Sequence, residues 1–212
     1  MIEIQTKIGK FEFCEEPHGY FLNGKKLDNT TSIMDAAGIT DYSKANPDDL
    51  EAARVKGQAV HLAIEWLEHR VDHEPLHPIV QAHVDQYVKF KHETGFEAVV
   101  VEMPLLCHAY GYATKVDLIG KYFGNWVIAE IKTSAYSAKH TPIQTAAQLL
   151  AFKAMKNLGF YPDIPENLHR HSLEIYEDRF KMSPPFLKED LNISVFLSAL
   201  WVTRYKRGDY AE

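Results

Sequence analysis

The stretch "VDLIGKYFGNWVIAEIKTS", Val116 to Ser134, combines two apolar segments with charged residues near their ends. The letters "YATKVDLIGKY" and "WVIAEIKT" each predict a strand, and "GKYFGN" predicts a tight return between them. Side chains alternate between the two faces of a strand, so Glu130 and Lys132 are expected to share one face. Because the return brings Asp117 opposite the Glu130 end, two carboxylates and a lysine should converge at one edge of an apolar sheet.

Two carboxylates beside a lysine suit the binding of a hard divalent cation. Such an ion keeps several of its waters and takes further oxygen ligands from a substrate phosphate. Lys132 beside the ion could hold or polarise an attacking water, which suits hydrolysis of a phosphodiester. The alternative is a solvated ion pair, because a Glu and a Lys two residues apart on a strand are most often that. The apolar letters "WVIA" favour the site, since a buried strand that carries two charges needs a reason.

Length and composition limit the class of protein. A chain of 212 residues with 46% hydrophobic content can bury one substantial core. We therefore expect a single domain over residues 1–212, with an N-terminal hairpin region, about residues 1–45, packed on that core. No stretch approaches the roughly 18 to 20 apolar residues of a membrane span, and "MIEIQTKIGKFEF" lacks the core of a secretory signal, which predicts a cytoplasmic protein without membrane association.

Cysteine count and net charge exclude further classes. Cys14 and Cys107 are the only cysteines and lie far apart, so neither a disulfide scaffold nor a cysteine-ligated iron-sulfur cluster is expected. The net charge of −6 excludes a protein that is basic all over, but a local basic groove could still bind a polyanion. His169 and His171, which flank Arg170 ahead of a strand, are expected to be solvated or to face a phosphate.

The remaining pattern predicts an α/β (α+β) fold: a central mixed sheet with an antiparallel meander, flanked by helices. Short strands fill the first 28 residues, with a hairpin turn at Asn23 and Gly24. The letters "TTSIMDAAG" predict a short helix with a threonine cap and a stop at Gly38, and Asn46 with Pro47 begins a long helix. Further helices are expected over Ile79 to Thr94, Thr141 to Leu158 and Leu187 to Tyr205, with another strand at "EAVVVEMPLL" and a hairpin at "LEIYEDRFKM".

The order of these motifs carries a resemblance to a known family. Asp117, then Glu130 to Ser134 ("EIKTS"), then a helix with Gln148, resembles the core of the PD-(D/E)XK nuclease superfamily. The chain is most similar to the RecB-type branch with its phage exonucleases, whose pattern is roughly G-x-x-D-L-I, a spacer, D/E-I-K-T-S and Q-x-x-x-Y. Gly57 and His61 match the G-x-x-x-H helix of that branch. The resemblance covers about residues 18 to 205 and implies a restriction-endonuclease-like core.

The resemblance implies a role for each residue of the central motif. Asp117 and Glu130 would ligate a catalytic Mg²⁺ or Mn²⁺ ion, and the main-chain carbonyl of Ile131 would contribute a further ligand. Lys132 would position the nucleophilic water. These assignments make Asp117, Glu130 and Lys132 the expected catalytic residues, together with Gln148.

Other positions receive their roles from the same resemblance. His61 would be a further metal ligand or would help to hold a second ion, although a lone histidine beside the apolar stripe of a helix is more often structural. Gln148 would orient the site or the scissile phosphate, while Phe152 stands where the branch usually has tyrosine. Glu102, on the preceding strand, would be an auxiliary acid. Contacts to DNA phosphates are expected from Lys139 and His140.

The expected function is that of a divalent-metal-dependent DNA nuclease, an exonuclease rather than a site-specific endonuclease, in phage or prophage DNA processing or recombination. DNA is the expected partner, and a homo-oligomer or a recombination partner protein is compatible with the resemblance. Two alternatives stay open: a non-catalytic DNA-binding recombination-accessory module that keeps the nuclease fold, and a nuclease acting on RNA. The polarity of digestion, the strand preference and the number of ions are not encoded in these motifs.

Overall fold

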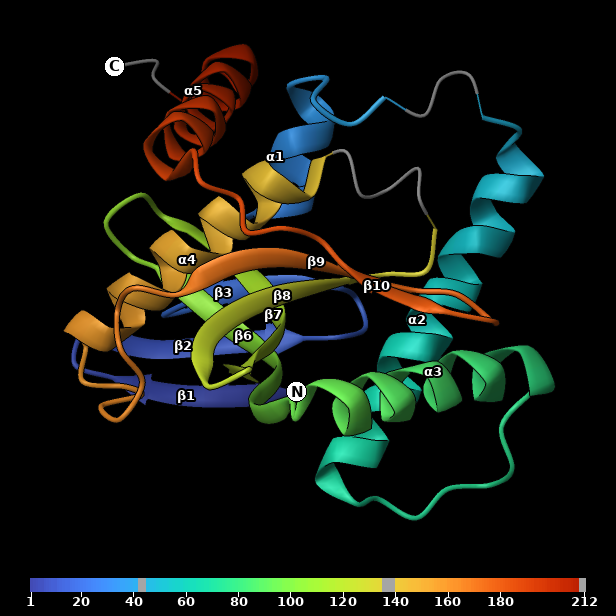
Figure 1. The fold of residues 1–212 in the computed structure, drawn as a ribbon. Helices are drawn as coiled ribbons and strands as arrows, with labels where there is room; N and C mark the ends of the chain where they lie inside the picture. The colour runs from blue at the N-terminus through green and yellow to red at the C-terminus, as the bar shows by residue number, and fades with distance from the viewer. Residues whose placement is uncertain (42–44, 135–139, 210–212) are drawn as a thin grey trace.

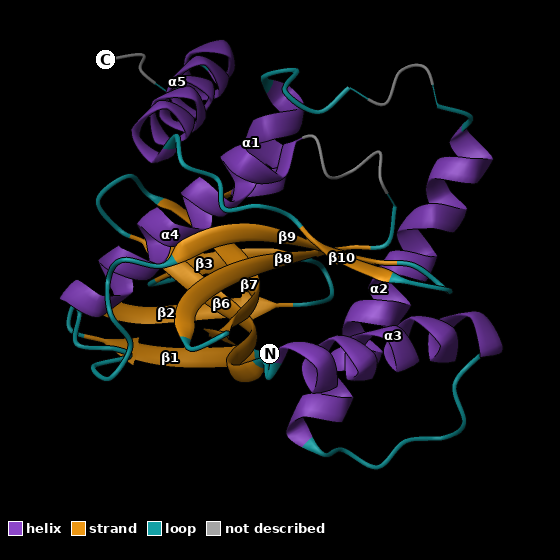
Figure 2. Ribbon diagram, in the orientation of Figure 1, coloured by secondary structure: helices purple, strands orange, loops and turns teal. Residues whose placement is uncertain are grey.

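The computed structural model describes residues 1–41, 45–134 and 140–209, and within them the protein is a mixed α/β fold (Figures 1 and 2). The mixed sheet with helices beside it confirms the fold class expected from the sequence. The helices in the described ranges are α1 (Thr30–Ala36), α2 (Pro47–His69), α3 (Pro78–Thr94), α4 (Thr141–Asn157) and α5 (Glu189–Arg207). No helix in these ranges is both long enough and apolar enough to cross a membrane.

Two sheets are present in the described part of the chain. The N-terminal sheet is antiparallel, in the order β1 (Ile2–Thr6), β2 (Gly9–Cys14), β3 (Gly19–Leu22) and β4 (Lys25–Lys26). The central sheet contains β5 (Asp28–Asn29), β6 (Glu97–Cys107), β7 (Tyr112–Tyr122), β8 (Asn125–Lys132), β9 (His169–Ile175) and β10 (Phe180–Met182). Its order is β10-β9-β8-β7-β5, with β6 also paired to β7.

The pairing of β7 leaves part of one strand edge without a strand partner. β6, β7 and β8 form the expected antiparallel meander, and β8 then pairs with β9 in parallel. β6 occupies one edge of β7 along most of its length, so β5 and β8 must share the other edge. β5 pairs there with residues 112 and 113, and β8 with residues 118 to 122. The positions from 114 to 117 therefore lie between the two partner strands.

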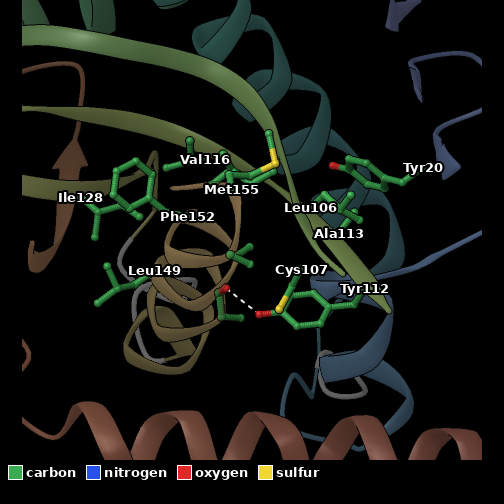
Figure 3. Packing of buried hydrophobic residues seen from close by; sticks show 14 of the residues in the cluster. Tyr20, Leu106, Cys107, Tyr112, Ala113, Val116, Ile128, Leu149, Phe152 and Met155 are labelled. Carbon is green, nitrogen blue, oxygen red and sulfur yellow. Dashed lines mark hydrogen bonds between the residues drawn. The ribbon is translucent and has the colours of Figure 1, made fainter. Parts of the chain in front are cut away.

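Helices cover both faces of the central sheet (Figure 2). Alternate side chains of β8 point to opposite faces, so Ile128 packs in the hydrophobic cluster that includes α4, whereas Ile131 packs in the cluster that includes α2 and α3. On the α4 side, the hydroxyl of Tyr112 donates to the carbonyl of Ala147 at 2.8 Å (Figure 3). Phe11 and other residues of the N-terminal sheet belong to this same cluster, so that sheet packs on the α4 side of the core.

Local signals explain most of the element boundaries. The turn at Asn23 and Gly24 has the two positive φ values, 52° and 77°, that a tight hairpin turn requires, which confirms the prediction. Asn46 caps α2 by accepting from the backbone N–H of Asp48. The expected threonine cap of α1 is wrong: Asn29 caps this helix by accepting from the N–H of Ser32, and Thr30 is already helical.

The expectation for His171 is also wrong, because this residue is only 4% exposed and its Nδ1 lies 2.8 Å from the carbonyl oxygen of Ser183. Its neighbour Arg170 is buried too. This residue lies in β9 between two paired neighbours, and only 1% of its surface is exposed. Its guanidinium donates to the carbonyls of Pro142 and Phe186 at 2.6 and 2.9 Å, so the charge is held inside the protein by backbone acceptors. Pairing of β9 with β8 places Arg170 and His171 in the interior.

Candidate metal centre

Three carboxylates lie in a row across three neighbouring strands. Glu102 is on β6, Asp117 on β7 and Glu130 on β8. The pairs Val101 with Leu118 and Met103 with Val116 flank the level of Glu102 and Asp117, and the pair Leu118 with Ala129 adjoins the level of Asp117 and Glu130. The three residues are only 4–5% exposed. Buried carboxylates are unfavourable unless charged or hydrogen-bonded partners compensate them, so the partners of this acidic row decide what it can do.

Asp117, at the centre of the row, replaces a missing backbone acceptor. Its Oδ2 accepts a hydrogen bond of 2.8 Å from the N–H of Ile131, at the point where β8 leaves the ladder with β7. Its Oδ1 lies 3.6 Å from Nδ1 of His61 on α2. The N–H of Ile131 and the imidazole of His61 therefore lie on different oxygens of Asp117.

His61, Glu102 and Asp117 form a group that could hold a metal ion. One ligand atom from each lies within 4.8 Å of the others, and Nδ1 of His61 is 2.8 Å from Oε1 of Glu102. Lys115 adds a cation, because its Nζ lies 2.6 Å from Oε2 of Glu102. A hollow lined in part by Glu65, Glu102 and Lys115 opens beside this group. One imidazole and two carboxylates are a donor set that suits a divalent ion.

Glu102 reaches this group through an unusual backbone conformation. Its φ is 47°, in the left-handed region, although the residue lies inside a strand. A non-glycine residue in this region costs on the order of 1 kcal/mol, and such residues concentrate at functional sites. The strained backbone therefore supports a functional role for the Glu102 side chain.

Glu130 has a separate set of partners. Its Oε1 accepts from Nζ of Lys132 at 3.0 Å and from Nε2 of Gln144 at 2.6 Å, while its Oε2 accepts from Nε2 of Gln148 at 2.6 Å. Lys132 Nζ also donates to Oε1 of Gln144 at 3.0 Å. Glu130 is not a member of the group within 4.8 Å. The row thus has one end engaged by a histidine and Lys115, and another end engaged by Lys132 and two amides.

Gln148 joins the acidic row to the gap in the edge of β7. Besides its bond to Glu130, Nε2 donates to the carbonyl of Lys115 at 3.0 Å, and that carbonyl lies between the parts of β7 that β5 and β8 occupy. The side chain is fully buried. A buried amide in this position fixes Glu130 and β7 relative to α4.

Six of the expected site residues fall into two neighbouring sets in the structure. His61, Glu102 and Asp117 come together, and Glu130, Lys132 and Gln148 come together beside them. Ile131 supplies its N–H to Asp117, and its side chain lies in the core. His140 is the half-buried residue before α4 and makes no side-chain capping bond, whereas Lys139 lies outside the described residues. Phe152 is buried and stacks on Tyr161, so this position belongs to the core.

Sequence reasoning did not select two residues that contact the row. Lys115 lies two positions before Asp117 on the same strand, and Gln144 lies one helical turn before Gln148. Both spacings put side chains on a shared face. Extending the motif by one strand or helix period would have found them.

Burial and neighbouring charges shift the pKa values of the group in opposite directions. Burial, together with the charge of Glu130, raises the pKa of Asp117 well above its usual value. Burial alone would raise the pKa of Glu102, but His61 and Lys115 outweigh it and the pKa is lowered. Burial would lower the pKa of His61, but the charges of Asp117 and Glu102 raise it to about 9. At neutral pH the metal-free group therefore holds a proton on His61.

The fold and the site define a mixed α/β protein with a buried row of acids that could hold a divalent metal ion. Comparison with protein-family models and with curated protein sequences finds no match to this chain. The function has to be inferred from the geometry of the site and from the order of its motifs.

Proposed function

We propose that the protein is a divalent-metal-dependent DNA nuclease of the PD-(D/E)XK type, with a restriction-endonuclease-like core. The observation that supports this most directly is the row of Glu102, Asp117 and Glu130 across β6, β7 and β8, with His61 near one end and Lys132 at the other. Metal-assisted phosphodiester hydrolysis requires carboxylates for the ion and a nearby cation for the developing charge. The row supplies the carboxylates, and Lys132 beside Glu130 supplies the cation.

His61, Glu102 and Asp117 would hold the ion, and Glu130 would join them by exchanging part of its hydrogen bonding. When bound, Mg²⁺ or Mn²⁺ would polarise the phosphate and lower the pKa of a bound water. Ion binding at neutral pH has to displace the proton of His61, whose pKa is about 9. The backbone N–H of Ile131 holds one carboxylate oxygen of Asp117, and the other oxygen faces His61, where the ion would bind.

Lys132 would position the attacking water. Its ammonium is 3.0 Å from both Glu130 and Gln144, and only 13% of its side chain is exposed. A cation held this firmly donates hydrogen bonds at a fixed point next to the carboxylates, so less ordering is needed when the substrate arrives. Lys132 also stabilises negative charge that develops on the phosphate oxygens.

The choice of DNA and of exonucleolytic cleavage, and the role in phage or prophage DNA processing or recombination, is supported by the motif order rather than by the geometry. Asp117, the "EIKTS" letters and the Gln148 helix follow in the order of the RecB-type branch, with His61 on the preceding long helix. An exonuclease should degrade linear DNA and leave covalently closed circles intact, which gives the proposal a direct substrate test.

The function is tested by cleavage of linear and circular DNA with Mg²⁺ or Mn²⁺. We expect cleavage of linear DNA that EDTA abolishes, and losses of at least about 100-fold in Lys132→Ala and Asp117→Asn. Lys181→Ala is the matched control, because Lys181 is an exposed strand lysine 3.9 Å from a glutamate and should leave the rate unchanged. Full activity in either site variant would refute the assigned mechanism. Tight DNA binding without turnover in either metal would instead identify an accessory module, and preferential cleavage of RNA in competition would identify a ribonuclease.

A further inference from the structure

Glu102 and Asp117 each direct one carboxylate oxygen at His61 and have the other oxygen engaged elsewhere. In Glu102, Oε1 lies 2.8 Å from Nδ1 of His61, whereas Oε2 lies 2.6 Å from Nζ of Lys115. In Asp117, Oδ1 lies 3.6 Å from the same Nδ1, whereas Oδ2 accepts from the N–H of Ile131. The two oxygens that face His61 therefore converge on one position, where a single ion would bind.

A centre with two metal ions needs the second oxygens as well. Such centres hold their ions about 3.5–4 Å apart, and a carboxylate that bridges the ions gives one oxygen to each. Glu130 cannot replace the missing oxygens easily, because both of its own accept from Lys132 or from glutamine amides. The N–H of Ile131 belongs to the backbone of β8 and is fixed by the fold. The contact that a side-chain substitution can remove is therefore that of Lys115 with Glu102.

The hollow beside the group shows where a second ion would lie. It has a volume of about 40 Å³, and its lining includes three carboxylates, those of Glu15, Glu65 and Glu102, together with Lys115. A buried water needs roughly 10–15 Å³ on the same scale, so the hollow has room for an ion. Glu65 lies one helical turn after His61 on α2, so both side chains project from the same face of that helix. Three carboxylates are suitable ligands for a hard divalent cation.

The ammonium of Lys115 is held in this hollow by contacts on two sides. Its Nζ is 2.6 Å from Glu102 and 6.0 Å from the centroid of the Phe13 ring, which is a cation–π distance. Its charge also acts on the neighbouring acid: burial and the charge of Glu102 raise the pKa of Glu65, and Lys115 counteracts them. Lys115 thus supplies positive charge that the three carboxylates would otherwise take from a cation.

We propose that the centre takes a single divalent ion, because Lys115 occupies the place of a second one. The inference rests on the proposed metal centre and specifies the number of ions. A second ion bound to Glu102 would lie beside the ammonium of Lys115, and like charges repel strongly in a partly buried site. The single ion would lie between two fixed ammonium groups, Lys115 at one end of the acidic row and Lys132 at the other. Lys115 is a positioning residue, since it acts through Glu102.

The number of Mn²⁺ ions bound by the full chain tests this proposal. Calorimetric titration should give about one ion for the wild type and about two for Lys115→Met, which keeps the aliphatic chain and removes the charge. The second ion should bind at least about tenfold more tightly in Lys115→Met than in the wild type. Two Mn²⁺ ions at this separation are magnetically coupled, so a spin-coupled EPR spectrum should appear in Lys115→Met and be absent from the wild type.

Three further variants show whether the charge of Lys115 is the cause. Lys115→Gln is a second neutral variant and should also bind two coupled ions. Lys115→Arg keeps the charge and should bind one ion. Lys121→Met is the matched control and should bind one ion, because Lys121 lies on the same strand with its Nζ 5.4 Å from the ring of Trp126, at the hairpin end of β7.

Parallel cleavage of linear DNA in Mn²⁺ separates this inference from the proposed function. A wild type that cleaves DNA and binds two spin-coupled ions overturns the single-ion centre and leaves the proposed function in place. The inference alone is also overturned if both neutral variants bind one ion, or if their second ion gives no spin coupling and so lies elsewhere. A wild type that binds no ion refutes the metal centre, and with it both proposals.

Discussion

Two regions of the molecule bury charge, and they do so with different kinds of partner. Arg170 on β9 donates to backbone carbonyls of Pro142 and Phe186, which the fold fixes and which cannot gain or lose a proton. The acidic row on β6, β7 and β8 includes bonds to other titratable side chains, such as that of Glu102 with His61 and that of Glu130 with Lys132. Partners of this second kind can exchange for a cation or release a proton. Burial of a charge therefore does not identify a functional site, whereas the chemistry of its partners does.

The Arg170 cluster also positions the site from a distance. Its guanidinium contacts the first turn of α4 through Pro142, and the N–H of Phe186 donates back to the carbonyl of Arg170 at 2.8 Å. α4 carries Gln144 and Gln148, the two amides that hold Glu130. The structural charge and the candidate functional charge are thus joined by one helix.

The largest expected effect is on stability, when the buried charge of Arg170 is removed. Arg170→Met removes the two hydrogen bonds that the buried guanidinium donates to the carbonyls of Pro142 and Phe186, and at about 1–3 kcal/mol for each charged hydrogen bond, the free energy of unfolding should fall by about 2–6 kcal/mol. Chemical denaturation measures this change. Arg179→Met is the control, because Arg179 is 64% exposed and pairs with an exposed aspartate, so a change below about 1 kcal/mol is expected. Equal stability of the two variants would show that the carbonyl clamp around Arg170 is not structural.

The next effect is the pH dependence of stability that His61 should cause. The pKa of His61 in the folded, metal-free protein is about 9, above its ordinary value of 6.5, because Asp117 and Glu102 outweigh the effect of burial. The folded state therefore binds this proton more tightly than the unfolded state, and the resulting stability, up to roughly 3 kcal/mol, is complete below pH 6.5 and lost as the pH rises through 9. Urea unfolding in EDTA measures the loss. NMR titration measures the pKa itself, with a His61→Gln spectrum identifying the resonance, and a midpoint near 6.5 would contradict the prediction.

The difference between the two regions also explains how far the sequence could predict the site. Asp117 and Glu130 meet through one tight hairpin, so alternation and turn chemistry were sufficient to place them opposite each other. Glu102 depends on a left-handed backbone inside β6, and His61 on the docking of α2, neither of which is a local property. Arg170 depends on strand pairing between segments about 40 residues apart, so its burial could not be read from its neighbours. Local geometry was therefore predictable, whereas the contacts made by tertiary packing could not be predicted from local patterns.

The smallest effect separates two glutamines that hold the same carboxylate. Gln144 is half-buried and bridges Glu130 to Lys132, whereas Gln148 is fully buried and also bonds the carbonyl of Lys115. If the proposed function is correct, Gln144→Ala should lower kcat by about 10- to 100-fold with KM little changed, because it only misplaces Lys132.

Stability distinguishes the two roles further. Gln144→Ala should change the free energy of unfolding by less than about 1 kcal/mol, while Gln148→Ala should lower it by about 1–3 kcal/mol, since a buried carbonyl loses its donor. Gln81→Ala, on the exposed face of α3, should change neither quantity. A Gln144→Ala enzyme with unchanged kcat would mean that Glu130 alone fixes the ammonium of Lys132. If Gln144→Ala lowers the stability as much as Gln148→Ala does, Gln144 also supports the packing of α4. The two glutamines would then not differ in role.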